Sequence, residues 1–141
     1  MADRETLSTI SSLREEFARK AQKEYPEIIV PGSGRNGSVT ADFYAKLADK
    51  MNNAAAALER GDLATGLVQL QEMQSTIASR TSRLEYNGKD CGRFSDKRTV
   101  LIAQADELKS ISQQLDTAIR SIAYDEKRQL EKMAASPDAM L

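Results

Sequence analysis

The spacing in this sequence that most resembles a catalytic or binding motif is a run of glycines within residues 25–39, YPEIIVPGSGRNGSV. Gly32, Gly34 and Gly37 follow the pattern G-x-G-x-x-G, in which glycines let the backbone approach a dinucleotide phosphate at the start of a helix. The residues from Ile28 to Val30 could supply the short strand that precedes such a site. Nucleotide binding at residues 32–38 is therefore one hypothesis.

The surrounding sequence favours a simpler interpretation of these glycines. A dinucleotide site needs a parallel sheet, and no convincing second strand follows Val39. Ser38 also stands where the related Walker pattern requires a lysine. We therefore expect residues 25–39 to form a Gly/Pro-rich loop between two helices, with residues 28–30 held against the helical bundle.

A second candidate is a basic stretch, residues 78–98, with the sequence ASRTSRLEYNGKDCGRFSDKR. Tyr86 and Phe94 lie among its cations, and this mixture can contact phosphates and stack on unpaired bases. The cations are Arg80, Arg83, Lys89, Arg93, Lys97 and Arg98. The net charge of −1 does not favour nucleic acid as a partner of the whole chain. An acidic protein surface and plain exposure to solvent are the alternatives for this stretch.

Several kinds of chemistry are disfavoured by residues that the chain lacks. It contains no histidine, which catalytic triads, Cys-His dyads and most zinc sites use. Its one cysteine, Cys91, cannot form a disulfide within the chain, and no base that would activate it is evident. Adjacent acids such as Glu15 and Glu16 would point about 100° apart on a helix, which is poor geometry for sharing a proton or a metal. We therefore expect no catalytic residue, no metal and no cofactor.

The composition also bears on the compartment. No stretch approaches the roughly 20 apolar residues that cross a bilayer. Residues 1–17 carry charges throughout and lack the continuous apolar core of a signal peptide. Together with the single cysteine, these features predict a cytoplasmic protein that does not enter a membrane.

Apolar residues at helical spacing define the first three helices. Residues 1–24 should form one helix and residues 40–86 a helical hairpin. Gly61 suits the left-handed residue that ends a helix, and Asp62 suits the N-cap of the next one. The apolar face of the hairpin should comprise Phe43, Leu47, Met51, Ala54, Leu58, Leu63, Leu67, Leu70, Met73 or Gln74, Ile77 and Leu84. The second arm should end near residues 86–92, where Asn87 and Gly88 favour a turn.

The turn of this hairpin explains a tripeptide that would otherwise suggest a cell-adhesion ligand. Arg60, Gly61 and Asp62 stand where one helical pattern stops and the next begins, so they read as a tight turn. The surrounding run AAAALERGDLATGLVQLQEM resembles the inter-helix turn of tetratricopeptide-type hairpins over about 20 residues. No copy of this run recurs about 34 residues away, so a stack of such repeats is not expected.

Residues 95–135 should form a long helix with a seam like that of a coiled coil. A leucine or isoleucine recurs every seven residues, and the pattern weakens beyond Ile122. The end of this helix is therefore expected to project from the bundle, and residues 136–141 to form a tail. We predict that a partner binds the seam through Leu101, Leu108, Ile111, Leu115 and Ile122.

These patterns predict an all-α fold: one domain, residues 1–141, formed by a four-helix bundle with a long C-terminal helix and a Gly/Pro-rich loop after the first helix. The function expected is non-enzymatic protein binding through helical faces, as an adaptor, inhibitor, chaperone or structural component of an assembly. The partner would be another protein, including a second copy of the chain. The alternatives are nucleic-acid or phosphate binding by residues 80–98 and nucleotide binding at residues 32–38.

Overall fold

The chain folds into four α-helices, as seen in a computed structural model that describes residues 4–25, 29–30, 34–92 and 96–135. The helices are α1 (Arg4–Ala21), α2 (Asn36–Glu59), α3 (Leu63–Asp90) and α4 (Asp96–Ala135). Two very short strands, β1 (Ile29–Val30) and β2 (Gly34–Arg35), precede α2. The predicted all-α class with a long C-terminal helix is confirmed.

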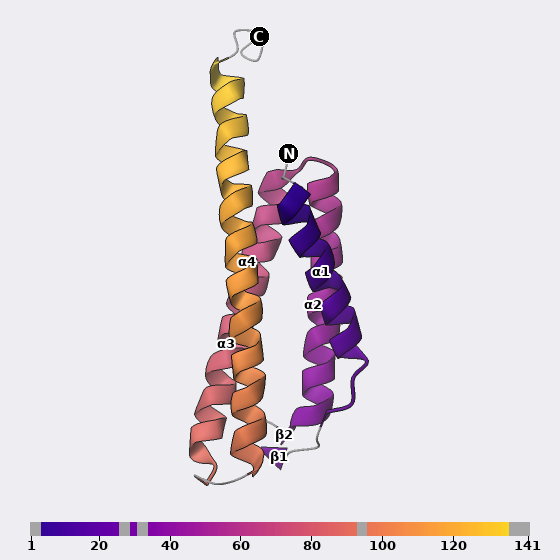
Figure 1. Cartoon of the computed structure of the whole chain (residues 1–141), viewed down its shortest axis with the longest axis vertical. Helices are drawn as coiled ribbons and strands as arrows, with labels where there is room; N and C mark the ends of the chain where they lie inside the picture. Colours follow the sequence, from indigo (N-terminus) through magenta and orange to yellow (C-terminus); the bar gives the residue numbers. More distant parts are fainter. Residues whose placement is uncertain (1–3, 26–28, 31–33, 93–95, 136–141) are drawn as a thin grey trace.

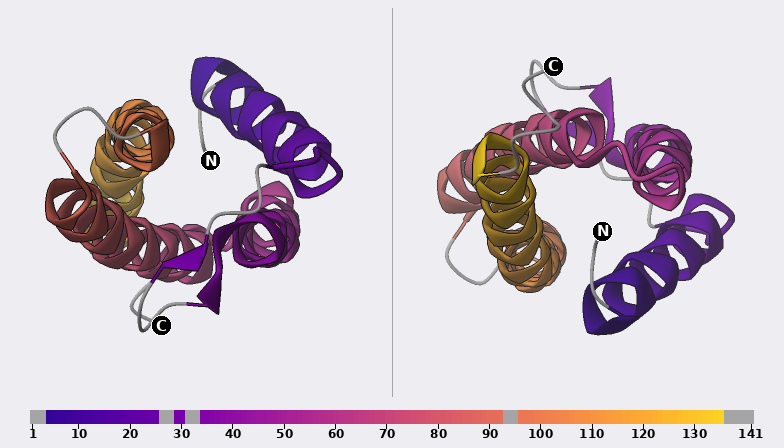
Figure 2. Two further views of the ribbon diagram at one scale, coloured as in Figure 1. Left: turned by 90° about the horizontal axis from the view of Figure 1, so that it is seen from below. Right: turned by 90° about the horizontal axis from the view of Figure 1, so that it is seen from above.

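The four helices run alternately up and down (Figure 1). α1 packs on α2, α2 on α3 and α3 on α4, whereas α1 and α4 share a much smaller contact. Viewed along the bundle, neighbours in the sequence are therefore neighbours around a ring (Figure 2). The pair α3 and α4 makes the most extensive contact of the fold.

One apolar core joins the four helices, and its residues recur three or four apart on each of them, as one-faced helices require. On α1 the periodic residues Ile10, Leu13 and Phe17 are buried. On α2 the buried aromatic residue is Tyr44, whereas the predicted Phe43 is half-buried at the edge of the core. The sequence left Met73 or Gln74 as the core residue on α3, and Met73 is the buried one.

The predicted turn at Gly61 and Asp62 is confirmed in atomic detail. Gly61 has φ +79°, the left-handed conformation that glycine adopts at little cost. Its N–H donates to the carbonyl of Leu58 at 3.0 Å and the N–H of Asp62 donates to the carbonyl of Ala57 at 2.9 Å, which is a Schellman motif. The carboxylate of Asp62 then caps α3 by accepting from the N–H of Thr65 at 3.2 Å.

Two helix ends differ from the sequence pattern, and α3 ends within the expected residues 86–92 but without the expected turn. α1 ends at Ala21, before Glu24, and α2 begins at Asn36, before Thr40. α3 continues through Asn87 and Gly88 to Asp90, so the prediction that these two residues form a turn is wrong. The cause is packing against α4: a Cβ on Gly88 would lie only 2.9 Å from Cδ1 of Ile102, so glycine allows the two helices to approach each other.

Candidate functional site

The five residues predicted to bind a partner through the long helix lie inside the bundle. Each is at most 1% exposed, and all five belong to the common core: Leu101, Leu108, Ile111, Leu115 and Ile122. Since α3 covers α4 more extensively than any other helix does, the seam holds this chain's own helices together. A partner could reach these side chains only if the bundle opened, and their partner role stays a prediction.

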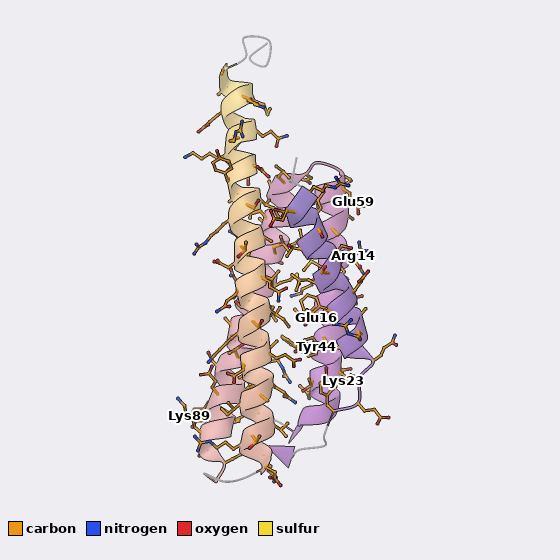
Figure 3. All side chains as sticks on the ribbon, in the orientation of Figure 1. Arg14, Glu16, Lys23, Tyr44, Glu59 and Lys89 are labelled. Carbon is orange, nitrogen blue, oxygen red and sulfur yellow. The ribbon has the colours of Figure 1, made fainter. Side chains whose placement is uncertain are left out.

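The basic residues predicted as a patch are divided by the fold. Arg80 and Arg83 line a groove beside α2, whereas Lys89 lies in the last turn of α3, at the end of the bundle remote from the C-terminal end of α4 (Figure 3). A rise of about 1.5 Å per residue separates Arg80 from Lys89 by about 13 Å along the helix. Lys97 and Arg98 lie in the first turn of α4. Arg93 lies outside the described residues.

We call the first of these places the Arg80 groove. It has a volume of about 370 Å³ and runs between the first half of α2 and the second half of α3. Each helix contributes residues at i, i+3, i+4 and i+7, so each presents a single face to the groove. The lining residues are Val39, Asp42, Phe43 and Lys46 from α2, and Thr76, Ser79, Arg80 and Arg83 from α3.

Arg80 is held at the base of this groove by two contacts to α2. Its Nη2 donates to Oγ1 of Thr40 at 2.8 Å, and its guanidinium carbon lies 4.9 Å from the centre of the Phe43 ring, a cation–π geometry. Burial lowers the pKa of Arg80, and the charge of Arg83 lowers it further. The two contacts fix the direction of the guanidinium, and among the described residues Thr40 accepts from one of its five N–H donors.

A second polar cluster fastens α1 to α4. Nζ of Lys20 on α1 lies 2.6 Å from Glu107 on α4 and 3.1 Å from Glu16, and it also lies over the ring of Tyr44 at 5.4 Å from its centre. Tyr44 is 2% exposed, and burial raises the pKa of its hydroxyl, with Glu107 adding to the shift. Figure 3 labels Glu16 and Tyr44 in this region.

At the other end of α1, Oγ1 of Thr6 donates to Oγ of Ser121 on α4 at 2.9 Å. Thr6 is buried and Ser121 is half-buried, so this hydrogen bond is partly shielded from water. Since α1 and α4 share little direct contact, these polar links at both ends of α1 close the bundle. We interpret them as structural.

The end of α4 extends beyond the other helices (Figure 1). We call residues 123–135 the α4 extension. Tyr124 on this extension is 62% exposed. Two non-aromatic apolar side chains farther along are also exposed, Leu130 by 57% and Met133 by 55%. At about 100° per residue, they lie on the face of α4 that Leu115 and Ile119 occupy inside the bundle. The apolar stripe of α4 thus continues where no other described helix covers it.

The carboxylate of Asp125 lies at the base of the α4 extension. Oδ2 of Asp125 is enclosed and accepts no hydrogen bond from the residues that the structure describes. Asp125, Arg128, Gln129 and Lys132 share one face, again at i, i+3, i+4 and i+7. A polar face that carries both signs of charge thus lies beside the apolar stripe.

The glycine-rich segment does not have the context of a dinucleotide site in its described part. Ile29 and Val30 pair with Arg35 and Gly34 in an antiparallel ladder, whereas the dinucleotide motif needs a parallel sheet. Gly37 and Ser38 lie in the first turn of α2. Gly32 and the rest of residues 31–33 lie outside the described residues, as does Ile28.

The remaining candidates carry no evident chemistry where they are described. Cys91 is a free thiol that packs, half-buried, against the edge of the core. In residues 4–25, 29–30, 34–92 and 96–135 no three metal-binding side chains gather, and none of the helices is long and apolar enough to cross a membrane.

The sequence patterns missed half of the Arg80 groove. They selected Arg80 and Arg83 from α3, but they placed Phe43 in the core and did not consider Lys46. The signal that could have found these residues is the i, i+3, i+4, i+7 spacing of Val39, Asp42, Phe43 and Lys46. Nothing in the sequence alone places that face of α2 beside Arg80.

Comparison with known proteins adds no assignment. None of the protein-family models, the curated proteins or the solved structures compared with this chain gives a significant match.

Proposed function

We propose that this chain is a non-enzymatic interaction protein that binds a helix of another protein chain through the α4 extension. The observation that carries the proposal is that the apolar stripe of α4 runs on from the core to Leu130 and Met133, which are more than half exposed. Single exposed apolar residues are ordinary on protein surfaces. Here, however, they continue a packing face on a helix that projects from the bundle, which is how helices present themselves to a partner helix.

The charges of the α4 extension match a second copy of the same chain. In an antiparallel pair of extensions centred near Arg128 and Gln129, Asp125 of one copy would face Lys132 of the other copy. The two-fold symmetry would form this pair twice. A second copy is therefore the first partner to test.

The expected affinity is modest. Fully burying an exposed side chain of this size contributes about 1.5–3 kcal/mol, and since Leu130 and Met133 are 57% and 55% exposed, covering each contributes about 1–2 kcal/mol. Two copies bury four such side chains, whereas association costs about 4–15 kcal/mol in lost freedom of motion. Self-association is therefore expected only at about millimolar concentration.

A site-specific photo-crosslinker can test the proposal. Placed at residue 130, it should form adducts with a second copy in purified protein, or with one other protein in cells that express the chain. Placed at exposed Gln113, on the part of α4 that lies within the bundle, it should form none. Met133→Asp should abolish the adducts while the circular dichroism spectrum and melting temperature stay unchanged. Adducts that persist in Met133→Asp, or no adducts in either setting, would refute the proposal.

A further inference from the structure

The Arg80 groove is cationic, although the chain as a whole is not. Lys46, Arg80 and Arg83 line it together with a single carboxylate, Asp42. The net charge of the whole chain is −1. The groove thus concentrates positive charge at one place between α2 and α3.

The guanidinium at the base of this groove is not neutralised by the described part of the chain. Lys20, Lys109 and Arg120 form ion pairs with carboxylates, whereas no ion pair joins Arg80 to one within the described residues. Removing a cation from water without a counter-charge is unfavourable. An anion that entered the groove would therefore gain more from Arg80 than from an exposed arginine, because the desolvation cost has already been met by folding.

We propose that the Arg80 groove binds an acidic, extended segment of a partner protein, with a carboxylate on the guanidinium of Arg80. The planar fork of arginine matches the two oxygens of a carboxylate, and its stacking on Phe43 presents that fork in a fixed direction. Lys46 and Arg83 supply further cations on opposite walls of the groove. Val39 and Phe43 supply apolar surface for a neighbouring side chain of the segment.

The dimensions and charge of the groove favour a short peptide over a nucleic acid. Residues i to i+7 of a helix span about 10 Å, which is the length of about three extended residues. A nucleic acid would need a longer track of cations, but Lys89, Lys97 and Arg98 lie at the end of the α3–α4 pair rather than along the groove. The groove belongs to α2 and α3, so this proposal does not depend on the proposed role of the α4 extension.

Fluorescence anisotropy on the full chain provides the test. The probe is a labelled octapeptide of alternating glutamate and leucine, and its matched control has glutamine in place of glutamate. We expect the glutamate peptide to bind and the glutamine peptide not to bind. The double variant Lys46→Gln, Arg83→Gln should bind the glutamate peptide at least about tenfold more weakly, because it lacks two cations of the groove. Both side chains are exposed, so their replacement leaves the core intact.

Lys89→Gln is the matched control, because it removes an exposed positive charge outside the groove. Its affinity should stay within about twofold of that of the unchanged chain. Arg80→Lys keeps the charge but loses the fork, and it should also weaken binding. The proposal is overturned if the glutamate peptide does not bind, if Lys89→Gln weakens binding as much as the groove variants do, or if free glutarate or a thymidine oligonucleotide displaces the peptide at equal concentration.

Discussion

The close approach of α2 and α3 leads to a prediction about Gly66→Ala. This substitution should destabilise the unchanged chain but stabilise a chain in which Leu58 has been shortened. Gly66 is buried on α3, and a Cβ added there would lie 2.6 Å from Cδ2 and 2.8 Å from Cγ of Leu58. Ordinary contacts between carbon atoms are about 3.5–4.0 Å long. The methyl group of Gly66→Ala would therefore overlap Leu58 by about 1 Å, and Leu58 is only 2% exposed, so it would have to shift within the core.

Two opposing effects determine how much Gly66→Ala changes the free energy of unfolding. Replacing glycine by alanine inside a helix usually stabilises the fold by about 1 kcal/mol. Overpacking a core usually costs about 1–3 kcal/mol. We therefore expect Gly66→Ala to lower the free energy of unfolding by about 1 kcal/mol.

Shortening Leu58 removes the overlap. Leu58→Ala alone should cost about 2–5 kcal/mol because it leaves a cavity. In that background the methyl group of Gly66→Ala enters the space that Cγ and Cδ2 had occupied, so the helix preference for alanine remains unopposed. Gly66→Ala should then raise the free energy of unfolding by about 1 kcal/mol.

These effects form a double-mutant cycle of four proteins: the unchanged chain, Gly66→Ala, Leu58→Ala and the double variant. Urea denaturation followed by circular dichroism measures the free energy of unfolding of each. The expected coupling between the two sites is about 2 kcal/mol, well above the error of the method. Additive effects, or a stabilising Gly66→Ala in the unchanged chain, would show that α2 and α3 are not packed as closely as described.

Three further predictions concern single groups. Gly61→Ala should lower the free energy of unfolding in urea by about 1 kcal/mol because alanine is strained at φ +79°, whereas Gly61→Asn should cost less; equal costs would contradict this. Hydrogen bonds from Thr65 lower the pKa of Asp62 below 3.8, so the ionised Asp62 stabilises the fold above that pH and this stabilisation is lost as the pH falls. Between neutral and acid pH, the melting temperature of Asp62→Ala should therefore change less than that of the unchanged chain. Burial raises the pKa of Tyr44, so the unfolded chain loses this proton first and stability should fall above pH 10, an effect that thermal melts should find smaller in Tyr44→Phe.

The parts of the fold that the sequence predicted correctly depend on local physics. Gly61 ends α2 and Asp62 caps α3 through contacts within a few residues, so their types and order were sufficient. Gly88 could not be interpreted in this way. Its helical conformation is accompanied by a close approach to Ile102 on another helix, and a prediction from local turn preference could not include that contact.

The candidate surfaces were likewise predictable in their residue types but not in their packing. The charges of Arg80 and Arg83 were visible in the sequence, but their separation from Lys89 and their position beside Phe43 follow from how α2 and α3 pack. A run of basic residues therefore became one groove and one exposed end. Charge counted along the sequence does not distinguish a shared surface from separate ones.

The seam and the α4 extension differ both in sequence pattern and in how far the other described helices cover them. α4 has 40 residues and α3 has 28, and at about 1.5 Å per residue the difference is about 18 Å. α3 ends at Asp90 and α4 begins at Asp96 at the same end of the bundle, so the excess length of α4 projects at the opposite end (Figure 1). The heptad pattern, which weakens beyond Ile122, did not predict Leu130 and Met133 as apolar contact residues. They are exposed because α4 is longer than α3. For this reason the proposed interaction surface lies at Leu130 and Met133, beyond the stronger seam from Leu101 to Ile122.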